Sequence, residues 1–313
     1  MSVTQWLGAR RAEAGLRLRF DLRHPAIGEL WRLGRWTLGY VLANQLGLAV
    51  VLTVANSADG GVAAYQWAFA IMQLPYAVIA VSMLSAVYPR LARTADDEAG
   101  FARHVAGGIR LTVVLLVPAA VGLVLLVDPI TSLLLGYGAA AGSGAAFVAD
   151  TLRWFGAALV PFCLYQLLTR SFYARSDTRT PMLANVGVNL VNVAAALAAF
   201  VALDAPRTRI AGLVAAYALS YLSGVGLLGW ALGRRHPATL LGIGRTSTTA
   251  LVASAGMSMV LLALLEVWPE PSQPAALAVR TVTLAGTGSL AYLLLGLLLR
   301  SPEIGQLWHR VRR

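Results

Sequence analysis

Eight apolar runs, each long enough to cross a lipid bilayer, constrain this sequence more than any other feature. A transmembrane helix needs about 20 consecutive residues that are mostly apolar. Because the hydrocarbon core offers no hydrogen bonds to the backbone, runs of this kind cross it as helices. The runs cover residues 36–54, 62–88, 111–127, 152–168, 182–203, 210–232, 246–265 and 275–299. The sequence therefore predicts an all-α, polytopic integral membrane protein with about eight transmembrane helices.

The composition is typical of a membrane protein. Apolar residues make up 58% of the 313 residues and charged residues only 12%. The net charge is +11, and all 25 basic residues are arginines. In a soluble protein such an excess of positive charge would suggest nucleic-acid binding. In a membrane protein it instead indicates how the chain is oriented in the bilayer and that it contacts anionic lipid. We therefore expect anionic membrane lipids, and no nucleic acid, among the partners. The single cysteine, Cys163, cannot form an intrachain disulfide.

The arginines are distributed unequally between alternate loops. With the N-terminus placed inside, 21 of the 25 arginines fall on the inner side. Short inner loops of membrane proteins are enriched in basic residues. An even number of spans also puts both basic ends of the chain on the same side. The sequence therefore predicts a multi-pass protein with both termini in the cytoplasm.

The spans divide the chain into four parts. These are a basic lead (1–35), a six-helix unit (36–232), a two-helix hairpin (246–299) and a basic tail (300–313). The lead is either an amphipathic helix at the lipid surface or a solvated tail, and the sequence leaves both open. A Gly/Ala-rich piece at 136–148 predicts a short helix between the third and fourth spans, which are the shortest. Pro75, within the long second span, predicts a kink.

A short polar loop joins the fourth and fifth spans. It ends on Thr180-Pro181, a helix-start signal, because threonine can cap free N–H groups and proline has no N–H to lose. We expect Asp177 and Thr180 to fix the shape of this loop. We expect Arg175 and Arg179 to anchor it to lipid phosphates.

Two further arginines, Arg153 and Arg280, lie just inside the fourth and eighth spans on the outer side. Either could bind a phosphate-bearing lipid through its guanidinium group. The alternative is that each side chain extends to the membrane interface without binding a particular lipid.

Several amide side chains lie within the spans. The candidates are Asn44, Gln45, Gln73, Asn185, Asn189 and Asn192. Polar groups in a span usually face a protein interior or a water-filled cavity. One interpretation is therefore a hydrophilic substrate cavity lined by the first, second and fifth spans. The other is hydrogen bonding between helices, which is common and contributes only about 0.6 kcal/mol per contact. For the set together we favour the cavity.

No pattern indicates an enzyme, a cofactor or a metal site. The acids Asp96, Asp97 and Glu98 lack a second acidic cluster, and we interpret them as a solvated helix start. The four histidines are scattered over loops and tails without metal-ligand spacing.

Two segments carry a resemblance to a known family. FYARSDTRTPMLANVGVNLVN (172–192) resembles the FYA-x-x-DT-x-TP signature of the MurJ/MviN family, part of the multidrug/oligosaccharidyl-lipid/polysaccharide (MOP) exporter superfamily. QLPYAVIAVSMLSAVYPRLAR (73–93), which contains Pro75 and Pro89, resembles that family's QLP…PRL segment.

The resemblance implies a flippase in the bacterial cytoplasmic membrane. Its members look like fourteen-helix proteins that carry lipid II, the undecaprenyl-linked peptidoglycan precursor, outward for cell-wall synthesis. This chain resembles the second six-helix lobe and the last two helices, whose groove is thought to hold the lipid tail. The first lobe is missing, so the implied partners are lipid II, a separate N-terminal lobe, or proteins of cell-wall synthesis. Some members bind sodium through acids, but the aligned positions here are Asn192 and Ala196, so we expect no ion site.

Two alternatives stay open at this point. The chain could be a scaffold that docks cell-wall synthesis proteins and transports nothing. It could also belong to an exporter of another polyprenyl-linked glycan, since such cargoes share the same tail.

Overall fold

The structure is a computed structural model that describes residues 25–136, 142–240, 242–271 and 273–305. Helices make up 89% of it, and the described residues contain no strand. Eight helices are long and apolar enough to cross a membrane. The predicted all-α membrane fold is confirmed.

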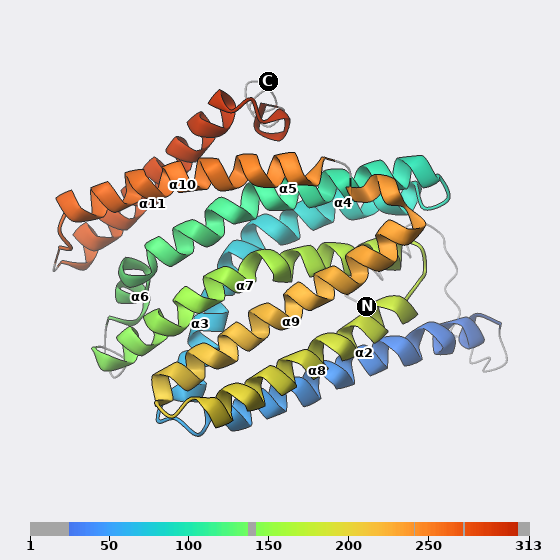
Figure 1. The fold of residues 1–313 in the computed structure, drawn as a ribbon, viewed down its shortest axis with the longest axis horizontal. Helices are drawn as coiled ribbons and strands as arrows, with labels where there is room; N and C mark the ends of the chain where they lie inside the picture. Colours follow the sequence, from blue (N-terminus) through green and yellow to red (C-terminus); the bar gives the residue numbers. More distant parts are fainter. Residues whose placement is uncertain (1–24, 137–141, 241, 272, 306–313) are drawn as a thin grey trace, which may run out of the picture.

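The helices run the length of the molecule in a stacked arrangement (Figure 1). In chain order they are α2 (Pro25–Ala55), α3 (Gly61–Pro75), η1 (Tyr76–Val81), α4 (Ser82–Arg93), α5 (Glu98–Leu125), α6 (Val127–Leu135), α7 (Ser143–Ala174), α8 (Arg179–Ala202), α9 (Pro206–Arg235), η3 (Pro237–Leu240), α10 (Ile243–Val267) and α11 (Pro274–Leu298). The central helix, α7, packs against α3, α5 and α9, while α8 packs between α9 and α2. The hairpin of α10 and α11 lies along α5, at the opposite side of the molecule from α2 (Figure 1).

Aromatic rings fill the centre of the six-helix unit. Phe155 of α7 contacts Tyr65 of α3 and Tyr217 of α9, with ring centroids 5.2 Å and 5.6 Å apart. Tyr217 also stacks on Tyr221 one turn later, at 4.7 Å. Such edge-to-face and tilted pairs are favourable arrangements for aromatic side chains. These ring contacts hold α3 and α9 against α7.

Several predicted boundaries differ from those of the helices in the structure. The third and fourth spans, predicted as the shortest, are the helices Glu98–Leu125 and Ser143–Ala174, with 28 and 32 residues. The short connecting helix is α6 (Val127–Leu135), earlier than predicted. Residues 137–141 lie outside the described residues, and Ser143 already begins α7. At the N-terminus, α2 begins at Pro25, so the end of the predicted lead is helical, while residues 1–24 are not described.

A π-helical stretch interrupts the second span. It covers η1 (Tyr76–Val81) and follows directly on Pro75. Proline removes one backbone hydrogen bond and its ring crowds the carbonyl four residues earlier, so the helix widens locally. Pro89 also lies inside a helix, α4, without ending it.

Candidate functional site

Three of the predicted amides meet where α2 packs on α8. Asn189 Nδ2 donates a hydrogen bond to Asn44 Oδ1 at 3.1 Å and another to the Asn185 carbonyl at 2.9 Å. Asn185 Nδ2 donates to the backbone carbonyl of Tyr40 at 3.0 Å. Gly47 permits this close packing, because a Cβ atom there would overlap Asn189 Oδ1. These amides therefore join two helices, as small and polar residues often do in membranes.

The other predicted amides do not join this contact. Gln45 is exposed on α2, and Gln73 is half-buried on α3. Asn192 is buried, and its Oδ1, like Asn185 Oδ1, has no hydrogen-bond partner within the described part of the chain. None of the three cavities described below is lined by any of the six amides. A cavity lined by them stays a prediction.

The loop between α7 and α8 is held by Asp177. One carboxylate oxygen accepts from the Thr180 backbone N–H at 2.9 Å, and the other accepts from the Thr180 hydroxyl at 2.7 Å. Thr180 lies in the first turn of α8, and Pro181 follows it there. The interpretation of Thr180 as the capping residue is therefore wrong, because Asp177 caps the N–H and Thr180 is the capped residue.

Arg175 joins three segments that are far apart in the sequence. Its Nη2 donates to Glu98 Oε1 at the start of α5, at 2.8 Å. Its Nη1 contacts His236 Nε2 just after α9, and its guanidinium lies 5.1 Å from the Phe101 ring centre. These side chains and Asp177 line a cavity of about 480 Å³. We call Glu98, Arg175 and His236 the inner cluster.

The inner cluster favours a neutral His236. Because Arg175 donates to Nε2, the ring proton belongs on Nδ1, which lies 2.5 Å from Glu98 Oε2. Burial lowers the pKa of His236. Glu98 raises this pKa, Arg175 and Arg235 lower it, and overall it falls below its ordinary value.

The carboxylate of Asp177 also has a shifted pKa. Burial raises the pKa of Asp177, but hydrogen bonds from Thr180 and Arg235 outweigh this and lower it overall.

Acidification is therefore expected to destabilise the protein through His236. A folded-state pKa below the ordinary value of 6.5 means that the unfolded chain binds the proton first, so stability falls as the pH drops below 6.5. The wild type should lose more of its thermal midpoint between about pH 7.5 and about pH 5.5 than His236→Gln does. Asp177 titrates below this window and should contribute equally in both proteins. An identical loss in both would contradict the prediction.

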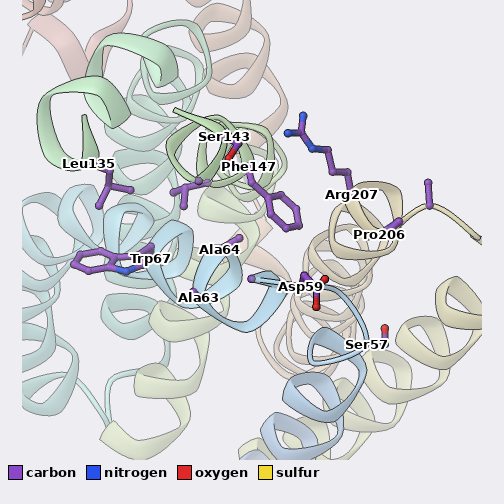
Figure 2. A pocket seen from close by; sticks show the side chains of 14 residues that line it. Ser57, Asp59, Ala63, Ala64, Trp67, Leu135, Ser143, Phe147, Pro206 and Arg207 are labelled. Carbon is purple, nitrogen blue, oxygen red and sulfur yellow. The ribbon is translucent and has the colours of Figure 1, made fainter. Parts of the chain in front are cut away.

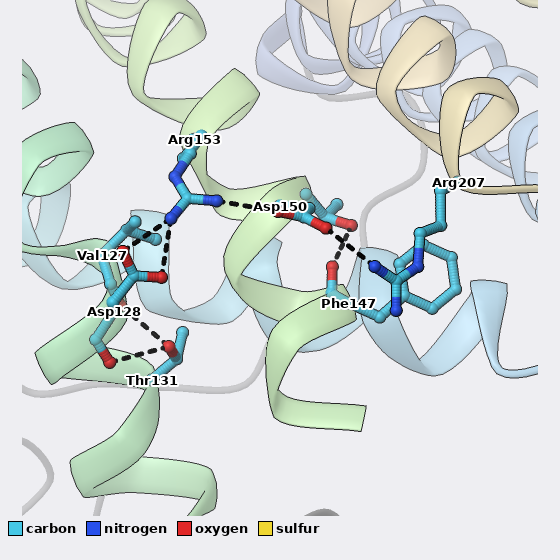
Figure 3. A network of polar contacts seen from close by, with 8 residues as sticks. Val127, Asp128, Thr131, Phe147, Asp150, Arg153 and Arg207 are labelled. Atoms are coloured by element: carbon cyan, nitrogen blue, oxygen red, sulfur yellow. Dashed lines mark hydrogen bonds and ion pairs between the residues drawn. The ribbon is translucent and has the colours of Figure 1, made fainter. Parts of the chain in front are cut away.

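The four predicted lipid-phosphate arginines have different surroundings. Arg153 binds Asp128 through Nη2 at 2.6 Å and Asp150 through Nη1 at 2.7 Å (Figure 3). Arg280 is only 3% exposed and donates twice to the Trp268 carbonyl. With Arg175 in the inner cluster, three of the four make polar contacts with protein groups, and their contact with lipid phosphate stays a prediction. Arg179 is exposed, and its guanidinium lies 5.7 Å from the Trp36 ring centre. Its contact with lipid phosphate stays a prediction.

An apolar groove of about 390 Å³ runs between α5 and the terminal hairpin. Its lining carries no charged side chain, and only Ser289 and Tyr292 have polar atoms. The Tyr292 hydroxyl is already used, because it donates to the Val114 carbonyl at 2.7 Å and so ties α11 to α5. Pro75 and Ile79, at the π-helical stretch, line one end. We call this feature the tail groove.

Several of these residues carry no local signal of their partners in the sequence. Glu98 is predicted only as part of a solvated helix start and His236 as a loop residue, and the two meet only through the fold. No group of three or more His, Cys, Asp or Glu side chains is placed to hold a metal ion among the residues that the structure describes.

Comparisons with known proteins give a consistent result. The family model described as "Lipid II flippase MurJ" matches residues 2–283. A "Probable lipid II flippase MurJ" of Rhizobium tropici is 31% identical over 294 residues, which is 93% of this chain and 53% of that protein. Its counterpart in Rhizobium meliloti (strain 1021) is 29% identical over 248 residues, or 77% of this chain and 45% of that protein. The chain thus spans about half the length of these relatives.

A solved structure shares the fold. "Lipid II flippase MurJ, inward closed conformation" superposes with a TM-score of 0.67 and 19% sequence identity. The match covers 99% of this chain and 60% of that one.

Proposed function

The chain belongs to the MurJ family, and from this membership we propose that it forms the lobe of a lipid II flippase that holds the lipid's polyprenyl tail. The cargo is an undecaprenyl-pyrophosphate-linked peptidoglycan precursor, which is moved across the membrane without covalent change. Transporters of this general design rock one lobe against another around a shared site. The tail groove supplies the part of such a site that a single lobe can offer.

The tail groove is the observation that carries this proposal. A polyprenyl chain has no polar atoms, so its binding requires a lining without unpaired polar groups. The groove meets this requirement. The Tyr292 hydroxyl is bonded to the Val114 carbonyl, and apart from Ser289 the other side chains that line the groove are apolar. The same chemistry would accept any polyprenyl-linked glycan, and an exporter of another such glycan is the second candidate.

The proposed location is the cytoplasmic membrane, with both chain ends inside. The excess of arginine on one side of the eight spans supports this orientation. The inner cluster and Asp177 then lie at the cytoplasmic ends of α5, α7 and α9, where they fix the loops between these helices.

Filling the tail groove is expected to weaken binding of the lipid tail. Gly122 lines the groove, and a Cβ atom there would have no atom within 4 Å, so this position can accept a side chain that reduces the space in the groove. Gly122→Leu should reduce retention of undecaprenyl-linked lipid about tenfold, as excluded volume in a packed site typically does. Native mass spectrometry of the purified protein, incubated with lipid II, measures this directly.

Gly229→Leu is the matched control. Gly229 is a half-buried helical glycine like Gly122, also with no atom within 4 Å of a Cβ, but it lies on α9 outside the groove. It should bind lipid II as the wild type does. Translocation of labelled lipid II in vesicles is measured separately. Binding that depends on the groove without any translocation would favour a scaffold, and equal binding by both variants would reject the groove assignment.

A further inference from the structure

A second groove, of about 1000 Å³, lies where α3, α7 and α9 begin (Figure 2). Its floor is made of small residues, Ala63 and Ala64 among them. Figure 2 shows Trp67 and Leu135 on one side of Ala64, and Phe147 with Arg207 on the other. It shares no residue with the tail groove or the inner cluster. We call it the end groove.

The two halves of the end groove differ in polarity. The half at Trp67 and Leu135 is apolar, whereas the other half carries the carboxylate of Asp59 and the guanidinium of Arg207. A ligand that fills both halves must therefore have an apolar part and a part with both signs of charge. An amphiphile with a zwitterionic headgroup fits this pattern better than a sugar, a free ion or a hydrocarbon chain does.

The charges near the end groove leave one carboxylate uncompensated. Arg153 binds Asp128 and Asp150, and Arg207 binds the other oxygen of Asp150 at 3.4 Å, the longest contact of this network (Figure 3). Asp59 is exposed and makes no ion pair or hydrogen bond within the described ranges. The position of Asp59 thus favours a cationic group on the ligand.

Arg207 can still bind an anion. Its side chain is 57% exposed, and its guanidinium lies 5.8 Å from the ring centre of Phe147, which supports it from one side. Since the contact with Asp150 uses only one nitrogen, the other N–H groups are free to donate. A phosphate is the anion that this planar donor group binds well.

The end groove lies at the depth of a membrane interface. It forms at the ends of three membrane-crossing helices, and Trp67 lies six residues after the start of α3, about 9 Å along the helix axis. Trp67 is 52% exposed, and tryptophan rings concentrate at the level of lipid headgroups. The arginine asymmetry favours the outer side for this end.

We propose that the end groove binds a phospholipid whose headgroup carries a primary ammonium, as in phosphatidylethanolamine. Asp59 accepts hydrogen bonds from the ammonium, and Arg207 donates to the phosphate. The first part of the acyl chains lies over Ala63 and Ala64 against Trp67. A choline headgroup has no N–H to donate to Asp59, and an anionic glycerol headgroup would leave Asp59 unpaired.

The test compares headgroups on the intact chain. Protein is purified into nanodiscs of equal phosphatidylethanolamine, phosphatidylcholine and phosphatidylglycerol, and the lipids that stay bound are counted by native mass spectrometry. Wild type should retain the ethanolamine lipid about fivefold over the choline lipid, the preference expected of one hydrogen bond that choline cannot make. Asp59→Asn should reduce this preference, because a neutral amide oxygen accepts a weaker hydrogen bond from an ammonium than a carboxylate does. Asp204→Asn, at an exposed carboxylate outside the groove, should keep it.

A second pair of variants locates the bound lipid. Trp67→Ala should reduce the number of retained lipids, whereas Trp154→Ala, at a ring of similar exposure outside the groove, should not. Equal retention of ethanolamine and choline lipids by the wild type would overturn the proposal without any variant. Equal effects of Asp59→Asn and Asp204→Asn would also overturn it, because they would show a general surface charge effect. Competition by glycerophosphoethanolamine as strong as by the lipid would point to a soluble ligand and would reject a lipid site.

Discussion

Gly224→Val is expected to destabilise the protein by about 3 kcal/mol, at the upper end of what overpacking costs a well-packed interior. Gly224 lies on α9, where this helix meets α7 and α8. A Cβ atom there would stand 2.5 Å from a methyl carbon of Val188 and 2.8 Å from the ring of Tyr165. Both neighbours are buried, and the Tyr165 side chain is fully enclosed, so neither has space to move away.

The matched control lies two residues along the same helix. Gly226 has no atom within 4 Å of a Cβ position, so Gly226→Val changes the same helix in the same way without a clash. Thermal unfolding in detergent should show a large fall in midpoint for Gly224→Val and little change for Gly226→Val. Similar falls in both variants would show that valine harms α9 itself and that the contact with Tyr165 is not what matters.

The contact at Gly224 also shows what the sequence could and could not predict. The eight spans follow directly from apolar runs, because bilayer thickness fixes the length of such a run. A glycine within a span carries no mark of whether a neighbouring helix approaches it. Gly224 and Gly226 look alike in the sequence, and only the packing of α9 distinguishes them.

The predicted starts of the third and fourth spans are wrong for a related reason. The third span was predicted from residue 111, whereas α5 begins at Glu98 and carries Arg103, His104 and Arg110 before that residue. Hydropathy detects only the part of a helix that lies in hydrocarbon, and it cannot detect a helix that continues into water. The helix α7 likewise begins at Ser143, before the predicted start at residue 152.

The site residues were predicted by type more successfully than by partner. The sequence groups the amides of the first and fifth spans, and those of α2 and α8 do meet, but it could not show that Asn189 bonds to Asn44 and Asn185 to the Tyr40 carbonyl. Arg153 and Arg280 were predicted either to bind a lipid phosphate or to extend to the interface, and both make polar contacts with protein groups. Their partners, Asp128 and the Trp268 carbonyl, depend on the tertiary fold.

Arg280→Leu is expected to loosen the terminal hairpin and to cost about 3 kcal/mol, the upper end for hydrogen bonds that involve a charged group. Arg280 Nε and Nη2 donate to the Trp268 carbonyl at 3.0 Å and 2.6 Å. Trp268 is the residue that ends α10, where the helix dipole is negative and carbonyls lack partners within the helix. Arg280 therefore caps α10 from within α11 and closes the hairpin.

Loosening the hairpin should also disturb the tail groove, because α10 and α11 form one of its walls. We expect Arg280→Leu to lower both the thermal midpoint and the retention of lipid II, whereas Arg280→Lys, which keeps the charge but provides a single donor group, should fall between it and the wild type. Arg103→Leu removes an exposed arginine of α5 and controls for lost charge. A variant Arg280→Leu that unfolds earlier yet retains lipid II fully would show that the hairpin's closure and the groove are independent. If Arg103→Leu had the same effect as Arg280→Leu, the effect would come from the change in net charge. Loss of the cap on α10 would then not explain it.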